Sequence, residues 1–185
     1  TLAILRRIGW PIPPTVATCL LTGIVTDTGR FQYSNTGPRT FLAAAQLVAA
    51  GAQPEVIGQH NYEEAPFGYL AVASAVTGRA VLEAEHRFVW SVLYPDDLTA
   101  AGVDRGDVDP LIDLIRLPRE SDVAALVKVM DDKTVRVSLR SRGRVDVGSI
   151  AAELGGGGHH NASGFTWEGD AAGAVGAVRE RLPHA

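Results

Sequence analysis

Cysteine and lysine are scarce in this chain, and long apolar runs are absent. The one cysteine, Cys19, excludes an intramolecular disulfide and fits a reducing compartment, so we expect a cytoplasmic protein. No apolar stretch approaches the roughly 20 residues that span a bilayer, so we expect no membrane partner. The chain contains two lysines and 15 arginines. This bias is better explained by a GC-rich genome than by a function. Internal repeats are absent, as are low-complexity tracts other than one run of glycines.

The charge balance is mildly acidic, with a formal net charge of −4. Proteins that grip long nucleic acids without sequence preference are usually basic. Any nucleotide site in this chain is therefore expected to be local and suited to a short ligand. Apolar residues make up 46% of the chain, which is enough for a core and argues against disorder. The length of 185 residues allows one large domain or two small ones.

The most unusual stretch runs from Gly155 to Gly164 and reads GGGGHHNASG. Four consecutive glycines offer no side chains to bury, so we expect no packing role for them. They provide backbone N–H groups that an anion can approach closely. His159 follows directly as a donor or proton carrier whose charge can change near neutral pH. A flexible loop with a stray histidine is the alternative, but the small residues that continue to Gly164 indicate a surface kept clear for a ligand.

An arginine-bearing strand is predicted just upstream, over residues 134–140 (TVRVSLR). Apolar and polar residues alternate there, which is the period of a strand with one buried face and places Arg136, Ser138 and Arg140 on the other. Asp146 fits the N-cap of a short helix that the glycine run ends. Arginine matches phosphate geometry with its two-pronged guanidinium. A solvated basic face is the alternative, but beside the glycine run phosphate binding is the better interpretation.

These residues together resemble a known family. Residues 138–165, SLRSRGRVDVGSIAAELGGGGHHNASGF, look like the C-terminal, DHH-associated domain of the DHH phosphoesterases. The family signature GGGHxxAxG is matched by Gly156, Gly157, Gly158 and His159, followed by Ala162 and Gly164. Among its members, the chain resembles the bacterial nanoRNases that also act on 3′-phosphoadenosine 5′-phosphate. In actinobacteria the same type of enzyme also cleaves cyclic di-AMP or its linear product.

The first third of the chain carries a second, shorter resemblance. The apolar stretch 15–24 predicts a buried helix whose buried face carries Val16, Cys19 and Leu20, with Ile24 as a further candidate. After it, residues 23–31 (GIVTDTGRF) are similar to the last metal-ligand motif of the DHH catalytic domain. By that resemblance Asp27 is a manganese ligand, and hard divalent cations do prefer carboxylate oxygens. On spacing alone, an aspartate before a Thr-Gly turn is more often an ordinary loop or cap residue.

The remaining pattern predicts an α/β protein in three parts. Residues 1–66 are expected to be the tail of a catalytic α/β DHH domain. Residues 67–78 are expected to form a connector helix with Phe67 and Leu70 on one face, and residues 79–185 a smaller α/β domain with a mixed sheet. The further expected elements are a helix end at residues 2–5, a strand at 31–33, helices at 40–50, 54–60, 95–101, 110–117 and 171–182, a hairpin of 80–84 with 88–94 whose exposed tip carries His86, paired strands 123–130 and 134–140, and a strand at 162–167.

The resemblance also implies roles for the residues. In the family two manganese ions in the DHH domain activate water, and the associated domain positions the phosphate and terminal nucleotide of the substrate. The candidate substrate-binding residues are Ser138, Arg140, Arg142, Gly156, Gly157, Gly158, His159 and Asn161. His159 is also the catalytic candidate, because it is placed to contact the phosphate or the nucleotide. Family analogy further implies a homodimer with contacts made by the first portion of the chain.

One departure from the family is large. The early DxD motif, the middle aspartate and the Asp-His-His motif do not occur in these 185 residues, and one carboxylate cannot hold two metals. We therefore expect a C-terminal fragment that is inactive by itself. The full-length chain is expected to be a manganese-dependent phosphoesterase that degrades short oligoribonucleotides and dephosphorylates 3′-phosphoadenosine 5′-phosphate, with cyclic di-AMP or pApA as further substrates. The alternatives are a non-catalytic nucleotide- or RNA-binding module and a RecJ-like single-strand exonuclease.

Overall fold

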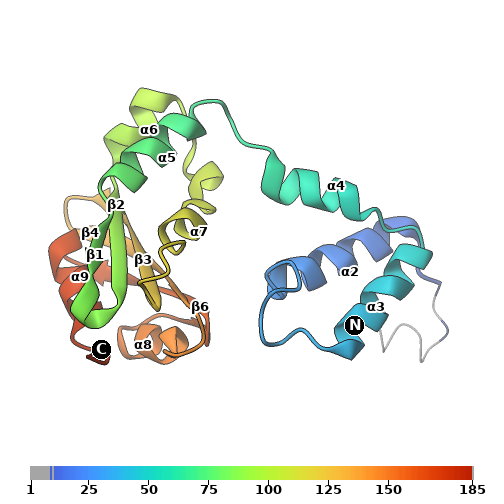
Figure 1. Cartoon of the computed structure of the whole chain (residues 1–185). Helices are drawn as coiled ribbons and strands as arrows, with labels where there is room; N and C mark the ends of the chain where they lie inside the picture. The colour runs from blue at the N-terminus through green and yellow to red at the C-terminus, as the bar shows by residue number, and fades with distance from the viewer. Residues whose placement is uncertain (1–8, 10, 185) are drawn as a thin grey trace. The chain divides into compact units, whose positions relative to one another are not determined.

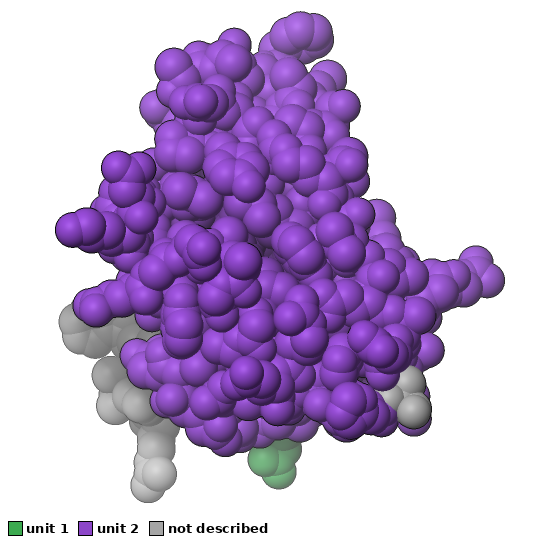
Figure 2. Space-filling model, turned by 90° about the vertical axis from the view of Figure 1, so that its left-hand side faces the viewer, with its two compact units in different colours: residues 1–64 green, residues 65–185 purple. Residues whose placement is uncertain are grey.

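The computed structural model describes residues 9 and 11–184, and the chain divides into two compact units, residues 1–64 and 65–185 (Figure 1). The second unit is coloured purple in Figure 2. The helix end expected at residues 2–5 lies outside the described residues. Within the described part of the chain, no helix is long and apolar enough to cross a membrane.

The first unit is helical in its described part. It contains α2 (Pro14–Asp27), α3 (Pro38–Ala49), α4 (Pro54–Gly58) and a turn of π-helix, η1 (Gln59–Glu63). Proline begins α2, α3 and α4, because its fixed φ suits the first turn, where no N–H is needed. Ala17 and Leu21 of α2 pack with Ala44 and Leu47 of α3 and with Ile57 in a small buried cluster.

The predicted buried face of α2 is only partly correct, because Leu20 and Ile24 are partly buried against this cluster. Val16 and Cys19 are exposed, whereas Ala17 and Leu21 are at most 2% exposed. The helix is apolar on more than one side, so the position of α3 decides which side is buried. The small Ala17 side chain lies toward α3 in the same cluster as Leu47.

The strand predicted at residues 31–33 is also wrong, because the chain turns there. Arg30 and Phe31 have φ angles of +60° and +64°, in the left-handed region that no strand contains. The Phe31 N–H donates to Thr28 Oγ1 over 3.1 Å. The Phe31 ring stacks on Phe41 with centroids 5.2 Å apart, which explains an aromatic residue in this turn.

The second unit, as far as it is described, is built on a six-stranded sheet in the order β1-β2-β3-β4-β6-β5. The strands are β1 (Val81–Glu83), β2 (Phe88–Leu93), β3 (Val123–Asp131), β4 (Thr134–Ser141), β5 (Gly157–His159) and β6 (Ala162–Glu168). Only β2 and β3 pair in parallel among these strands, so the expected mixed sheet is confirmed. The helical segments are α5 (Tyr69–Gly78), η2 (Ala84–His86), α6 (Pro95–Ala101), η3 (Arg105–Val108), α7 (Leu111–Ile115), α8 (Val147–Glu153) and α9 (Ala171–Arg179).

Strand β3 is packed on both faces. Val123, Ala125 and Val127 belong to the core that α8 and α9 cover. Ala124 and Leu126 belong to a second core, on the opposite face, which α5 and α7 cover. Each of the five side chains is at most 1% exposed. The strand therefore reads as a continuous apolar run, as expected for a strand with no solvent-facing side.

Strand β4 confirms the predicted alternation. Its residues Val135, Val137 and Leu139 are at most 3% exposed and lie in the core beneath α8 and α9. The residues between them, Arg136 and Ser138 among these, lie on the other face, and Arg136 is exposed. The pairing of β3 with β4 across the turn after Asp131 is confirmed as well.

The predicted face of α5 is wrong. Phe67 and Leu70 are 90% and 64% exposed, whereas Val72 and Val76 are buried against β2 and α7. Alanine and valine occur around the whole helix, so the sequence leaves the buried stripe open. The helix packs within the second unit, against β2, α6 and α7.

His86 at the tip of the first hairpin is not solvent-exposed as predicted. Its side chain is 9% exposed, because the His184 ring lies over it with the centroids 4.8 Å apart. Arg87 turns the chain at this tip with a φ of +47°. The segment after α9 therefore returns to the hairpin, a contact between residues 98 positions apart (184 minus 86).

A charged cluster ties the edge strand β1 to α9. Arg179 donates from Nε and Nη2 to the two oxygens of Glu83, over 2.7 and 2.6 Å. Trp90 Nε1 donates to the same carboxylate over 2.8 Å. The hydrogen bond from Arg179 is the main reason that the pKa of Glu83 lies below its ordinary value. Hydrogen bonds to a charged carboxylate of this kind hold the short edge strand in place.

Candidate functional site

Within the described residues of the second unit, one face of strands β4, β6 and β5 is largely open. On the other side of these strands α8 packs against all three. On the open side, α5 and α7 lie mainly over β2 and β3 (Figure 1). We call the uncovered surface the open face, and its residues are Arg136, Ser138 and Arg140 of β4, Ala162, Gly164 and Thr166 of β6, and Gly157 and His159 of β5.

The register of the strands sets the order of side chains on the open face. Arg140 pairs with Ala162, and Ala162 pairs with His159, so the three stand in one cross-strand row. Paired residues of antiparallel strands project from the same face. Adjacent strands lie about 4.8 Å apart, so the backbones of Arg140 and His159 are separated by about 10 Å. The small Ala162 side chain between them leaves a gap with a cation on one side and an imidazole on the other.

A second row, beside the first, has almost no side chains. Ser138 pairs with Gly164, and Gly164 pairs with Gly157. A Cβ placed on Gly164 would come within 2.7 Å of the Val137 carbonyl oxygen, so this position needs glycine. A Cβ on Gly157 would meet nothing within 4 Å, because Gly157 faces open space. The row forms a flat floor with one hydroxyl at its end.

Arg140 and His159 are both available to a ligand. Arg140 is half-buried, and its Nη1 donates to the carbonyl of the preceding residue, Leu139, over 3.0 Å. Across the described residues, no carboxylate forms an ion pair with Arg140, and no hydrogen bond engages the exposed His159 ring. A guanidinium without a counter-ion beside a free imidazole favours an anionic ligand.

The glycine run has structural roles that the sequence analysis did not predict, and the first is to end helix α8. The Gly156 N–H donates to the Ala151 carbonyl over 2.8 Å, and the Gly155 N–H donates to Ala152 over 3.1 Å, which together end α8 in a Schellman motif. Gly155 has the required positive φ, +81°. The Gly156 N–H is therefore committed to the helix end and not free for an anion as predicted.

The second structural role of the glycine run is to allow close packing of β5 against β6. A Cβ on Gly156 would lie 2.2 Å from the Gly164 carbonyl oxygen and 2.5 Å from Phe165 Cβ. Gly158 has a φ of +144°, and a Cβ there would lie 2.5 Å from Ser163 Cα. The prediction that these glycines have no packing role is wrong, because the glycines let β5 approach β6 closely.

Two predicted substrate-binding residues have partners within the fold. Arg142 Nη2 donates to the carbonyls of Arg116 and Leu117, both over 2.9 Å, at the end of α7. Asn161 Oδ1 accepts from Ser141 Oγ over 3.0 Å in the turn between β5 and β6. Both residues hold the end of the open face together.

The turn between β5 and β6 is also tied to the start of α8. Asp146 caps the helix as predicted, accepting from the Ser149 N–H over 3.1 Å. This backbone hydrogen bond is the main reason that the pKa of Asp146 lies below its ordinary value. His160 lies beside it, with Nδ1 at 3.5 Å from Asp146 Oδ2, and its Nε2 is 3.1 Å from the Gly143 carbonyl oxygen.

Arg136 and Thr166 are residues of the open face that the sequence-based candidate list omitted. They face each other across β4 and β6, at the end of the face away from Arg140. The alternation of polar and apolar residues in β4 indicates that Arg136 lies on the same face as Arg140. Only the register of β4 with β6 shows that Thr166 lies beside Arg136.

Asp27, the predicted manganese ligand, is the exposed last residue of α2. Its carbonyl oxygen accepts from Asn35 Nδ2 over 3.0 Å. In the described residues, no group of three or more histidine, cysteine, aspartate or glutamate side chains is placed to hold a metal ion. The one carboxylate of Asp27 gives too few ligands to hold the ion by itself. The assignment of Asp27 stays a prediction.

Comparison with known proteins identifies a family and shows how much of each relative this chain covers. A sequence profile of the DHHA1 domain matches residues 87–183. The bifunctional oligoribonuclease and PAP phosphatase NrnA of Thermus thermophilus is 36% identical over 155 residues, which are 83% of this chain and 45% of that protein. The cyclic-di-AMP phosphodiesterase GdpP of Bacillus subtilis is 32% identical over 177 residues, which are 91% of this chain and 24% of that protein. This chain thus spans less than half the length of either relative.

A solved structure agrees with the fold. The crystal structure of an exopolyphosphatase-related protein from Bacteroides fragilis matches 97% of this chain and 54% of its own, with a TM-score of 0.84 at 23% sequence identity. At this level of identity the match supports the architecture.

Proposed function

We propose, from the premise that this chain belongs to the DHHA1 domain family, that its second unit is the nucleotide-recognising part of a DHH-family phosphoesterase. Relatives named as oligoribonuclease, PAP phosphatase and cyclic-di-AMP phosphodiesterase support this class of substrate. The proposed substrates are short oligoribonucleotides and 3′-phosphoadenosine 5′-phosphate, with cyclic di-AMP or pApA as further candidates. The observation that carries the proposal is the row of Arg140, Ala162 and His159 on the open face.

The proposed binding mode follows from that row. A phosphate lies over Ala162, where the Arg140 guanidinium donates to it from one side and His159 from the other. The Ser138 hydroxyl is the nearest side-chain donor in the adjacent row. The glycine floor of Gly164 and Gly157 then lets a ribose or base lie flat against the backbone.

Metal chemistry enters the proposal only as an expectation from the family. Divalent ions supply an activated water and neutralise charge on phosphorus in phosphoesterases. The described residues of this chain do not assemble such a centre, so no step of the binding mode depends on it. The contribution assigned to this chain is to hold, orient and neutralise the phosphate.

Nucleotide affinity of the 185-residue chain tests the proposal. Arg140→Ala should weaken the binding of adenosine monophosphate about 10- to 100-fold, because a hydrogen bond to a charged group contributes about 1.5–3 kcal/mol. Isothermal titration calorimetry without metal measures this ratio.

Arg181→Ala is the matched control for this titration. Arg181 lies just after α9, on the covered side of the sheet, and pairs with Glu153 over 2.9 Å. Its loss removes the same charge and should leave nucleotide affinity within about twofold. Equal affinity of wild type and Arg140→Ala would show that the arginine strand is only a solvated basic surface.

We also propose that the first unit pairs with a second copy of this chain. Helix α3 leaves Phe41, Leu42 and Val48 exposed by 55%, 61% and 44%, an apolar surface on an otherwise small unit. The mass from sedimentation velocity should be that of a dimer, and Leu42→Asp should halve it without changing nucleotide affinity. A monomeric wild-type chain at micromolar concentration would contradict the pairing.

A further inference from the structure

A cavity of about 360 Å³ lies at one end of the open face, between the sheet and the segment of α6 and η3. Its volume falls at the lower end of the range of about 300–1,000 Å³ that ligand pockets occupy. The cavity and the open face share two residues, Ser138 and Arg136. The cavity side chains Leu93 and Lys128 continue the row of Arg136 across β2 and β3, so the cavity opens on the same side of the sheet.

The lining of the cavity is cationic. Three cations, Arg105, Lys128 and Arg136, stand against one carboxylate, Asp109. Lys128 forms an ion pair with Asp109, and the Arg105 guanidinium donates to the carbonyls of the β3 end. Among the described residues, Arg136 has no carboxylate partner, and it is exposed. Arg136 is thus the cation in the lining that remains free to bind an anion.

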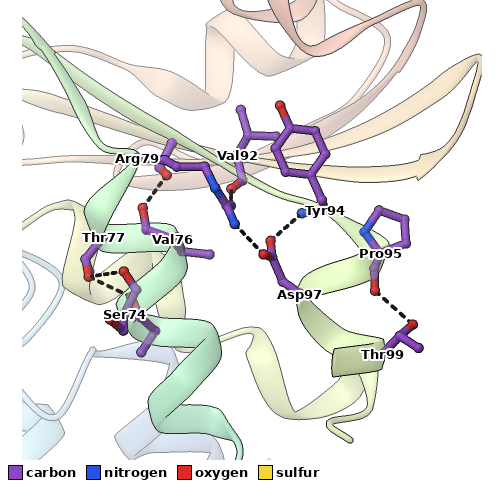
Figure 3. A network of polar contacts seen from close by, with 11 residues as sticks. Ser74, Val76, Thr77, Arg79, Val92, Tyr94, Pro95, Asp97 and Thr99 are labelled. Atoms are coloured by element: carbon purple, nitrogen blue, oxygen red, sulfur yellow. Dashed lines mark hydrogen bonds and ion pairs between the residues drawn. The ribbon is translucent and has the colours of Figure 1, made fainter. Parts of the chain in front are cut away.

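The aromatic residue Tyr94 lines the cavity, and a polar network holds its backbone while Arg79 contacts its ring. Arg79 donates to the Val92 carbonyl over 2.7 Å and forms an ion pair with Asp97 (Figure 3). Asp97 Oδ2 in turn accepts from the Tyr94 N–H over 2.9 Å. The Arg79 guanidinium carbon lies 5.1 Å from the centroid of the Tyr94 ring.

This network makes Tyr94 suited to stack on a base. Tyr94 is one of the residues that line the cavity, it is 44% exposed, and the Arg79 guanidinium lies against its ring. An aromatic ring that is held before binding loses little conformational freedom when a base stacks on it. Stacking of this kind contributes about 1–3 kcal/mol per base in single-strand binders.

The spacing along β4 connects the cavity with the row of Arg140. Arg136, Ser138 and Arg140 follow one another at about 6.7 Å on the same face, so the two arginines are about 13 Å apart. Both arginine side chains are long and flexible, so their guanidiniums can lean toward each other and contact consecutive phosphates of a nucleotide chain that runs along β4, one at Arg140 and one at Arg136. The one carboxylate of the lining, Asp109, is paired with Lys128.

We propose that the cavity is a second nucleotide subsite, in which Arg136 binds a phosphate and Tyr94 stacks on the base of the nucleotide next to the one at Arg140. This inference rests on the proposed function and adds to it a second binding site beside the row of Arg140. The binding surface is fitted to a dinucleotide or longer oligonucleotide rather than to a mononucleotide alone.

The test compares two probes, adenosine monophosphate and the linear dinucleotide pApA, by calorimetry with the 185-residue chain. Wild type should bind pApA about tenfold or more tightly than adenosine monophosphate, because the second base adds its stacking free energy. Arg136→Ala and Tyr94→Leu should each lose about tenfold in affinity for pApA and less than twofold for adenosine monophosphate. Tyr94→Phe keeps the ring and should bind both probes as wild type does.

The outcomes separate the subsite from the proposed function. If Arg136→Ala and Tyr94→Leu bind pApA as wild type does while Arg140→Ala loses both probes, the cavity is no subsite and the proposed function stands. If Arg140→Ala binds adenosine monophosphate as wild type does, or if wild type binds neither probe, both are overturned. Arg181→Ala controls for the loss of charge, and equal melting temperatures show that the variants are folded.

Discussion

Gly156→Ala is expected to lower the free energy of unfolding of the second unit by about 3 kcal/mol, the upper part of the range for overpacked positions. The added Cβ would lie 2.2 Å from the Gly164 carbonyl oxygen, a backbone atom that cannot rotate away. Strand β5 must then move off β6, and the Schellman bond from Gly156 to Ala151 is disturbed with it. Because His159 lies on β5, nucleotide affinity should fall as well.

The neighbouring glycine supplies the control. A Cβ on Gly157 meets nothing within 4 Å, so Gly157→Ala should change the unfolding free energy by less than about 1 kcal/mol. The methyl group nevertheless enters the floor of the open face and should weaken nucleotide binding. Urea titration followed by the fluorescence of Trp90 and Trp167 measures both variants. Similar stabilities for Gly156→Ala and wild type would mean that β5 does not pack closely on β6.

Some of the candidate site could be predicted because it depends on local patterns. The alternation of β4 gives the face of Ser138 and Arg140, since the side-chain period of a strand fixes the faces once one of them is apolar. The carboxylate of Asp146 identifies the start of α8 by its capping chemistry. These features need no knowledge of distant parts of the chain.

The rest depends on contacts that no local pattern encodes. The glycines of β5 have no side chains, so nothing in their sequence gives the register that places His159 opposite Ala162. Arg142 has the same local signature as Arg140, yet it donates to the end of α7, more than 20 residues upstream. The cavity beside Arg136 forms only after the β2–β3 crossover folds over the sheet, and for that reason the sequence did not indicate it.

Helix faces were the least predictable feature. Helix α2 is rich in small and apolar residues on several sides, and α5 is similar, so the local pattern did not identify Ala17 or Val72 as buried. Charged residues normally mark the exposed stripe of a helix. Neither α2 before Asp27 nor α5 contains one, and tertiary packing alone selects the buried side.

Leu139→Ala is expected to cost about 3 kcal/mol of unfolding free energy, within the range of about 2–5 kcal/mol for truncated core leucines. Leu139 is 0% exposed and packs in the core with Val147 and Phe165. Its neighbour Arg140 lies on the open face of the same strand, so Arg140→Ala should change stability by no more than about 0.5 kcal/mol. Leu139→Ala is therefore expected to lower stability and keep nucleotide affinity, whereas Arg140→Ala is expected to keep stability and lower nucleotide affinity.

Measuring stability and affinity on both variants tests whether β4 separates fold from function by its two faces. Below its unfolding transition, Leu139→Ala should bind adenosine monophosphate within about threefold of wild type, because the open face is intact in the folded fraction. Arg140→Ala should melt like wild type and bind poorly. If Arg140→Ala instead lost stability as large as that of Leu139→Ala, its guanidinium would be a structural group and weak binding would reflect unfolding. The pair thus decides whether the arginine on β4 serves the ligand or the fold.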